Sequence, residues 1–270
     1  KRWADSFGLQ CLRTPGGHRR FRLKDIYQFQ QQRAFEATGL LSTEEWEDPN
    51  LEVWLNARKY SKVRELLVHL AAHNQRPKLR YLFERLYLRG MQLDDIYDEV
   101  VVPLDEGVLK SRDNGEVTEG QSLLVRNNLE EALSSLTQKM IRRRSNGKTA
   151  LCGSPTELTR MAVSVISRIL EIEGWEALNL GDSVPLRVMS EVVEIEPVNL
   201  VCVFSASSDL PEDLKEGCDS LRKITQGYRI PIILITAKDD ADTALARGLS
   251  TEECCSDFRA FRKHLNNFSH

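Results

Sequence analysis

The sequence predicts an α/β protein in which a truncated winged helix precedes a four-helix bundle and a doubly wound parallel sheet of Rossmann or flavodoxin type. Three observations lead to this prediction. A basic segment with a Pro-Gly-Gly turn opens the chain, four apolar stripes at helical spacing follow, and strand-like and helical segments then alternate. Such alternation is typical of a parallel sheet that helices cover on both faces.

Length and composition agree with several domains of ordinary size. We expect a partial winged helix over residues 1–37, a linker over 38–58, the bundle over 59–147 and the sheet domain over 148–270. No apolar run approaches the ~20 residues of a membrane span, and no signal peptide opens the chain, so no membrane partner is predicted. The six cysteines show no metal-ligand spacing, which predicts a cytoplasmic, reducing setting without a bound metal.

The first part centres on a basic hairpin. Pro15–Gly17 supplies the turn, because glycine tolerates the positive φ that hairpin turns need, and Leu9–Arg13 and His18–Arg22 can pair as short strands. Residues 1–40 hold eight Lys or Arg and three acids, a net charge of +5, which leaves −8 for the rest of a chain whose total is −3. A basic head on an acidic body is typical of a protein that contacts phosphate with one end.

This arrangement predicts double-stranded DNA as a partner. The helix that ends near Ala4 would lie in the major groove, and the hairpin arginines would contact phosphate or the minor groove. His18 is expected to pack the hairpin rather than read a base, and the alternative for the arginines is a surface charge without a partner. The predicted DNA-binding residues are Lys1, Arg2, Arg13, Gly16, Gly17, His18, Arg19, Arg20 and Arg22.

The middle of the chain reads as helices. An apolar stripe from Val63 to Ala71 predicts one helix, and another from Leu79 to Tyr87, after Pro77, predicts a second. Further helices are predicted over 92–109 and 122–143, and four such helices make a bundle. The acidic segment before them, with Trp46 and Trp54, is expected to be a linker that docks through its tryptophans. Arg142–Arg144 is expected to form a solvated C-terminal cap of the last helix, with DNA contact as the alternative.

The last part alternates strands and helices. Strands are predicted at 149–153, 175–180, 199–204 and 230–236, with a weak one near Cys254, and helices at 156–173, 185–196, 211–227 and 257–267. Ligands of such sheets bind at the carboxyl ends of the strands. Cys152 and Cys202 are expected to be buried thiols. The adjacent Cys254 and Cys255 are expected to be packed or exposed thiols, with redox activity as the alternative.

The hairpin carries a family resemblance. The string Arg13-Thr14-Pro15-Gly16-Gly17-His18-Arg19-Arg20-Phe21, with Arg2-Trp3 before it and Asp25-Ile26 after it, resembles the winged helix-turn-helix of MerR-family and excisionase-like regulators. The resemblance implies a DNA-binding fold. In that family a first helix and a turn precede the motif, and their absence here predicts a truncated or cleaved chain.

The later parts resemble one group within the MerR family, the cobalamin-binding repressors of carotenoid genes that respond to light. The matching motifs are Asp95-Ile96-Tyr97, Val102-Pro103-Leu104, Gly115-Glu116-Val117-Thr118, Gly174-Trp175-Glu176 and Leu180-Gly181-Asp182-Ser183-Val184-Pro185. The resemblance implies that a cobalamin would lie between the bundle and the sheet domain.

The cofactor residues that this resemblance implies are largely absent. The family's Glu-x-His-x-x-Gly run falls on Glu157, Thr159 and Ala162, so the cobalt-ligating histidine is a threonine, which is a poor ligand for cobalt. The positions of the family's cap residues, a tryptophan followed by a Glu-His pair, are Arg112, Ser122 and Leu123. A Gly-Gly pair after the fourth strand has become Thr236-Ala237, and Ser205 is the polar match that remains after the third strand.

The sequence therefore predicts a DNA-binding transcriptional regulator, acting as a repressor, without a resident cofactor and without enzymatic activity. Its expected partners are DNA, a second copy of the chain in a homo-oligomer, with a dimer as the simplest form, and a protein antirepressor. The alternative is a small-molecule or cobalamin and light sensor that uses the crevice between bundle and sheet without histidine ligation. A cobalamin-dependent enzyme is a third reading, which the threonine at position 159 disfavours.

Overall fold

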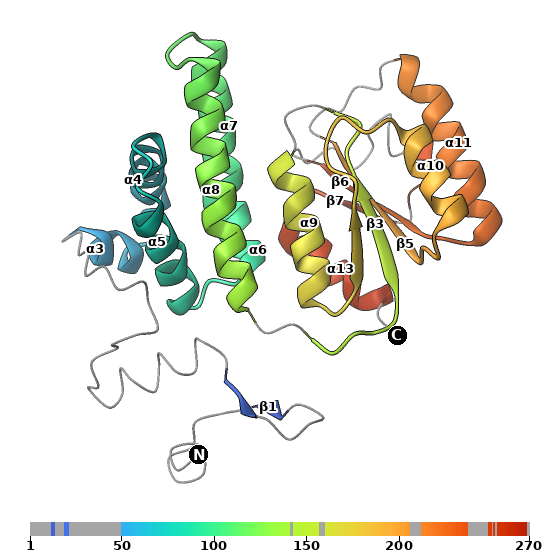
Figure 1. Ribbon diagram of the computed structural model, residues 1–270, viewed down its shortest axis with the longest axis horizontal. Coiled ribbons are helices and arrows are strands. Elements are labelled where there is room, and N and C mark those ends of the chain that lie inside the picture. The colour runs from blue at the N-terminus through green and yellow to red at the C-terminus, as the bar shows by residue number, and fades with distance from the viewer. Residues whose placement is uncertain are drawn as a thin grey trace. The chain divides into compact units, whose positions relative to one another are not determined.

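A computed structural model of the chain describes residues 12–13, 19–21, 50–140, 143–156, 160–205, 212–236, 248–249, 251 and 253–268. The chain divides into two compact units, Lys1–Ile141 and Arg142–His270, shown in Figure 1. The predicted recognition helix and most of the predicted linker lie outside the described residues. No helix in the described ranges is long and apolar enough to cross a membrane.

The hairpin strands are paired as the turn chemistry predicted. β1 (Leu12–Arg13) and β2 (Arg19–Arg20) run antiparallel, with Leu12 opposite Arg20 and Arg13 opposite Arg19. Arg20 is exposed. The other predicted DNA-binding residues, Lys1, Arg2, Gly16, Gly17, His18 and Arg22, lie outside the described residues.

The rest of the first unit is helical. It contains α3 (Leu51–Asn56), α4 (Tyr60–Ala72), α5 (Arg76–Leu88), a rod made of α6 (Leu93–Ile96), η1 (Tyr97–Val101) and α7 (Val102–Asp113), and α8 (Glu119–Lys139). Helix α8 packs against α4, α5 and α7, and the apolar stripes of these helices form the core. The side chain of Thr118 accepts from the backbone N–H of Gln121 at 3.2 Å in a capping box, so α8 begins earlier than its apolar stripe suggested.

One predicted boundary was wrong in part. Helix α3 lies within the segment that was expected to be a linker. Leu51 and Leu55, one turn apart, are both buried, and α3 packs against α4. Glu52 on the same helix forms ion pairs with Arg85 and Arg89 of the α5 region. A short helix is marginal alone in water, so these contacts explain why residues 51–56 fold as a helix.

The expected cap at Arg142–Arg144 was wrong in its place at the end of the last helix, although Arg143 and Arg144 are exposed as expected. Helix α8 ends at Lys139, and the backbone N–H of Arg143 donates to the carbonyl of Ile172 at 2.8 Å. The Arg143 side chain pairs with Glu173 at 2.6 Å, and Arg262 donates to the other carboxylate oxygen at 2.7 Å. Glu173 is buried, and a buried carboxylate requires paired charge, so Arg143 belongs to the packing of the second unit.

The second unit is a five-stranded parallel sheet in the order β4-β3-β5-β6-β7. Its strands are β3 (Thr149–Gly153), β4 (Glu176–Asn179), β5 (Leu200–Ser205), β6 (Ile232–Thr236) and β7 (Glu253–Cys255). Helices α9 (Arg160–Ile172) and α13 (Phe258–Phe268) lie on one face, and α10 (Leu186–Ile195) and α11 (Glu212–Tyr228) lie on the other (Figure 1). This is the flavodoxin-like order of a doubly wound sheet, so the predicted fold class of this part is confirmed.

Candidate functional site

The loops after β3 and β4 are held together at the carboxyl edge of the sheet. Ser154, which directly follows β3, is buried, and its hydroxyl lies 3.0 Å from that of Thr156. Its backbone N–H donates to the carbonyl of Gly181 at 3.0 Å, and its own carbonyl accepts from Val184 at 2.9 Å. The chain reverses its winding between β3 and β5, so this edge is where such a sheet places a ligand.

The next strands end in buried polar side chains. Ser205 and Thr236 are opposed in the register of β5 and β6, and both are buried. Thr236 also hydrogen-bonds the thiol of Cys254 on β7; burial raises the pKa of that thiol, and this hydrogen bond lowers it in part. Cys152 and Cys202 are buried as predicted. No group of three His, Cys, Asp or Glu side chains in the described ranges could hold a metal ion.

The residues implied by the family resemblance are described only in part, and they are divided between the two units. Glu157 and Thr159 lie outside the described residues, and Ala162 is half-buried on α9. Arg112, at the cap position, donates to the carboxylate of its neighbour Asp113 at 2.7 and 3.0 Å. A guanidinium engaged by a carboxylate does not present the large apolar face that a corrin ring would need above it.

Ser122 and Leu123, the other two cap positions, point to different sides of α8. Successive helical residues are turned by about 100°, so the two side chains cannot face one cavity. Ser122 is 2% exposed whereas Leu123 is 47% exposed. The described cap positions therefore do not fit a cobalamin that is capped as in the resembling family.

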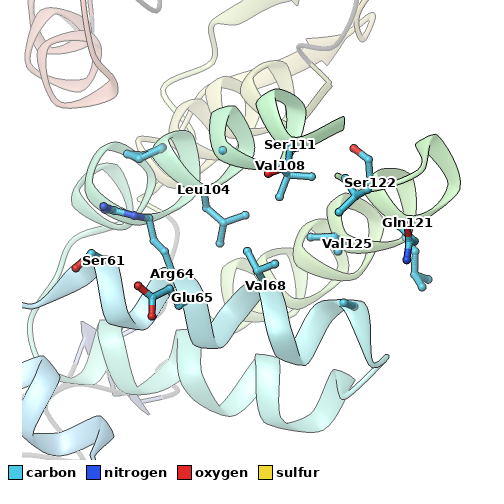
Figure 2. Close-up of a pocket in the computed structure, with 15 residues that line it drawn as sticks. Ser61, Arg64, Glu65, Val68, Leu104, Val108, Ser111, Gln121, Ser122 and Val125 are labelled. Atoms are coloured by element: carbon cyan, nitrogen blue, oxygen red, sulfur yellow. The ribbon is translucent and has the colours of Figure 1, made fainter. Parts of the chain in front are cut away.

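Ser122 instead lines a cavity of about 530 Å³ within the first unit (Figure 2). The cavity lies between α4, α7 and α8. Its walls are mainly apolar, with Val68 from α4, Leu104 and Val108 from α7, and Val125 from α8. This volume and this lining are typical of a site for a small organic molecule.

Polar groups stand at the two ends of this cavity. Figure 2 shows Ser61, Arg64 and Glu65 at one end and Gln121 and Ser122 at the other, with Val68, Leu104 and Val108 between them. Glu65 is paired with Lys62 at 2.7 Å, and Gln121 is occupied in the capping box of α8. The guanidinium of Arg64 donates from Nη1 to the carbonyl of Glu99 at 2.7 Å.

The wall formed by α7 is open at Gly107. A Cβ built at this position meets no atom within 4 Å, although the residue lies inside a helix and lines the cavity. Glycine in a helix interior is less favourable than alanine by ~0.5–1 kcal/mol. The absence of a side chain at Gly107 therefore leaves space for a ligand in the cavity, and it makes helix α7 less stable than alanine would.

Sequence patterns indicated little of this cavity. Ser122 was singled out through the resemblance, but for a different role, and Arg64 and Gly107 were not singled out. Two features of the sequence could have pointed to the cavity. Pro103 interrupts the predicted third helix and lines the cavity. The apolar run Leu123-Leu124-Val125 covers more of the helix surface than one packed face requires, and Leu124 and Val125 line the cavity.

No family model and no curated protein matches this chain. Several solved structures are similar to it. The Methanosarcina barkeri monomethylamine corrinoid protein has a TM-score of 0.53 and 13% identity, over 76% of this chain and 95% of that one. A novel cobalamin-binding protein from Desulfitobacterium hafniense DCB-2 has a TM-score of 0.37 and 11% identity, over 76% and 98%. The methanol:cobalamin methyltransferase complex MtaBC from Methanosarcina barkeri has a TM-score of 0.35 and 10% identity, over 93% of each chain.

The likeness to the monomethylamine corrinoid protein shows a shared fold. Its coverage of most of both chains, together with the flavodoxin-like strand order, means that this chain contains a domain with the fold of a cobalamin-binding protein. At 13% identity the likeness concerns the fold alone. The predicted cobalamin-binding type of fold is thus confirmed.

Proposed function

We propose that this protein is a DNA-binding transcriptional regulator that acts as a repressor. The observation that supports the proposal best is the antiparallel pair β1–β2, in which Arg13 and Arg19 occupy directly opposed positions and Arg20 is exposed. Like charges at opposed positions destabilise a strand pair unless an anion lies nearby. The phosphate backbone of DNA supplies such anions, and a basic hairpin beside a recognition helix is the geometry of a wing.

In this proposal the two folded units serve association rather than chemistry. A single winged helix has a small footprint, and a second copy doubles it and sets the spacing of two half-sites. The units behind the hairpin would hold two copies together or bind an antirepressor protein. No enzymatic step is part of the proposal, because the described carboxyl edge offers hydroxyls and a thiol without a histidine beside them.

A gel-shift titration with the full-length protein and promoter fragments, over a series of salt concentrations, tests this proposal. Arg20→Gln should weaken binding on every fragment and reduce the slope of log affinity against log salt by about 0.9, the value for one phosphate contact. Arg187→Gln is the control, since Arg187 is an exposed residue of the second unit that pairs with Glu191 at 2.9 Å. The proposal is wrong if the full-length protein binds no DNA, or if the two variants bind alike.

The shared fold favours one second candidate, a cobalamin sensor that works without histidine ligation. The purified protein would be incubated with cobalamins in the dark, separated from free cofactor by gel filtration, and examined by absorbance before and after illumination. A retained chromophore and a light-dependent change in particle size would support the sensor. A colourless protein fraction would exclude it and leave regulation to a protein partner or another ligand.

A further inference from the structure

The cavity between α4, α7 and α8 has walls that suit an apolar body. Val68, Leu104, Val108 and Val125 are contributed by three different helices, so the surface is built by the fold and not by one exposed stripe. Leu124, on the same side, is 41% exposed. Burying this surface under an apolar ligand is favourable by ~25 cal/mol for each Å² removed from water.

The end of the cavity at Arg64 carries positive charge. Glu65 is paired with Lys62, so it does not neutralise Arg64, and no ion pair to Arg64 is found in the described part of the chain. A guanidinium has five N–H donors, and its bond to the carbonyl of Glu99 occupies one of them. The remaining donors suit a carboxylate, which an arginine can bind through two parallel hydrogen bonds.

The opposite end holds the hydroxyl of Ser122. This residue is 2% exposed and lines the cavity, and its side chain makes no hydrogen bond with any residue that the structure describes. Its oxygen is not among the fully enclosed side-chain atoms that lack a partner, so it is reachable from the cavity and can bond to water or to a ligand. A ligand group that donates or accepts a hydrogen bond, such as a hydroxyl or a carbonyl, would satisfy it.

We propose that this cavity binds a small amphipathic carboxylate. Its carboxylate lies at Arg64, its apolar body fills the space beside Gly107, and a hydroxyl or carbonyl on that body meets Ser122. The inference does not depend on DNA binding or on cobalamin, because every residue that it uses belongs to the helices of the first unit. It makes the first unit a sensor for a metabolite of this class.

Binding of anilinonaphthalene sulfonate, an apolar fluorescent probe with one anionic group, tests the cavity directly. The purified protein should enhance its fluorescence, and lauric acid should displace it. A Cβ at Gly107 meets no atom within 4 Å, so Gly107→Phe should place its ring in the cavity and weaken probe binding by about tenfold or more, the effect of ~1.4 kcal/mol. Gly120→Phe is the matched control, because Gly120 also has open space around it but does not line the cavity.

Two further comparisons test the polar contacts. The methyl ester of lauric acid should displace the probe about tenfold less well than the acid, because the ester carries no charge for Arg64. The ω-hydroxy derivative should bind more tightly than lauric acid to the unmodified protein, and Ser122→Ala should remove that difference. Equal binding by Gly107→Phe and Gly120→Phe, or equal displacement by acid and ester, would overturn the proposal. So would an advantage of the hydroxy acid that survives Ser122→Ala.

Discussion

Arg64 on α4 donates from Nη1 to the carbonyl oxygen of Glu99, 2.7 Å away and 35 positions later in the chain. Pro103 stands four residues after Glu99 and has no N–H, so the α-helical donor to this carbonyl is absent. The rod is also π-helical over Tyr97–Val101, immediately before this point. Arg64 therefore supplies a hydrogen bond where the helix lacks one, which holds α4 against the rod and positions the charged end of the cavity.

This relationship predicts a coupling between Arg64 and Pro103. Arg64→Met should destabilise the protein by about 0.5–1.5 kcal/mol, because it removes an exposed hydrogen bond to the Glu99 carbonyl. In a Pro103→Ala background the new N–H can donate to that carbonyl, so the same substitution should cost less. Urea unfolding of the four proteins in this cycle measures the coupling energy. Lys110→Met on exposed α7 surface is the control and should change stability by less than about 0.5 kcal/mol. Equal costs in both backgrounds would contradict the coupling.

Gly174 ends α9 in a Schellman motif, which explains the Gly-Trp pair in the sequence. The backbone N–H of Trp175 donates to the carbonyl of Leu170 at 3.0 Å, that of Gly174 donates to Glu171 at 3.2 Å, and Gly174 has a φ of 92°. A Cβ at this position would lie 2.4 Å from the carbonyl oxygen of Arg144. The motif thus joins the end of α9 to the segment that enters the sheet.

Gly174→Ala should therefore destabilise the second unit by about 2 kcal/mol or more, since strain at positive φ adds to a clash with backbone. Gly115→Ala is a matched control, because Gly115 has a φ of 74° but open space where the Cβ would lie. The control should cost only about 1 kcal/mol. Thermal unfolding of both variants measures the difference, and equal losses would mean that the contact with Arg144 is of no consequence.

Local sequence patterns predicted the second unit better than the first for a physical reason. In the second unit β3, β5 and β6 are short buried runs and the helices have one apolar face, so local patterns sufficed to place most elements in order. The hairpin followed from the turn chemistry of Pro15–Gly17 in the same way. The sequence did not distinguish a Rossmann-like from a flavodoxin-like strand order, because the order depends on contacts between strands that are distant in the sequence.

The errors concern residues whose partners are remote. Helix α3 forms because Leu51 and Leu55 are buried and α3 packs against α4, and the single apolar turn of Leu51, Trp54 and Leu55 is too short a pattern to predict a helix by itself. Arg143 was assigned to a helix end because its partner Glu173 lies 30 positions away. The cavity is the space between three helices that are distant in the sequence, so no local sequence pattern predicts it. Ser122 was identified through the family resemblance, but only the structure shows that it lines the same cavity as Arg64 and Gly107.

Asp105 and Arg126 form a largely buried ion pair in the first unit, with the Arg126 Nε and an Asp105 oxygen 2.6 Å apart. Removing one partner from such a pair leaves an uncompensated charge, so Asp105→Leu should cost about 3 kcal/mol. The double variant Asp105→Leu, Arg126→Met should be more stable than the single one, because it leaves no charge behind. Denaturant unfolding at neutral pH decides this, and a double variant that is less stable than the single would contradict it.

The same pair predicts how stability changes with pH. Burial raises the pKa of the Asp105 carboxyl above its ordinary value, and Arg126 lowers it in part through a hydrogen bond and its charge. The folded protein therefore holds this proton more tightly than the unfolded chain. The contribution of Asp105 is favourable at low pH and is lost as pH rises from the unfolded pKa, near 4, through the raised folded pKa. Unfolding between pH 3 and 7 should show this decrease relative to the Asp105→Leu variant, and parallel curves would exclude it.

The cysteines of the second unit should differ widely in their rates of alkylation. Cys152, Cys202 and Cys255 are buried, and burial raises the pKa of Cys202 well above its ordinary value. Burial also raises the pKa of Cys218 to about 11, whereas Cys254 is the one half-buried thiol among the described cysteines. The thiolate is the nucleophile, so iodoacetamide at pH 8 should modify Cys254 first and leave Cys152 and Cys202 intact. Timed mass spectrometry measures the order, and labelling in urea, where all should react alike, is the control. Early modification of Cys152 or Cys202 in the folded protein would show that the sheet opens far more readily than its burial indicates.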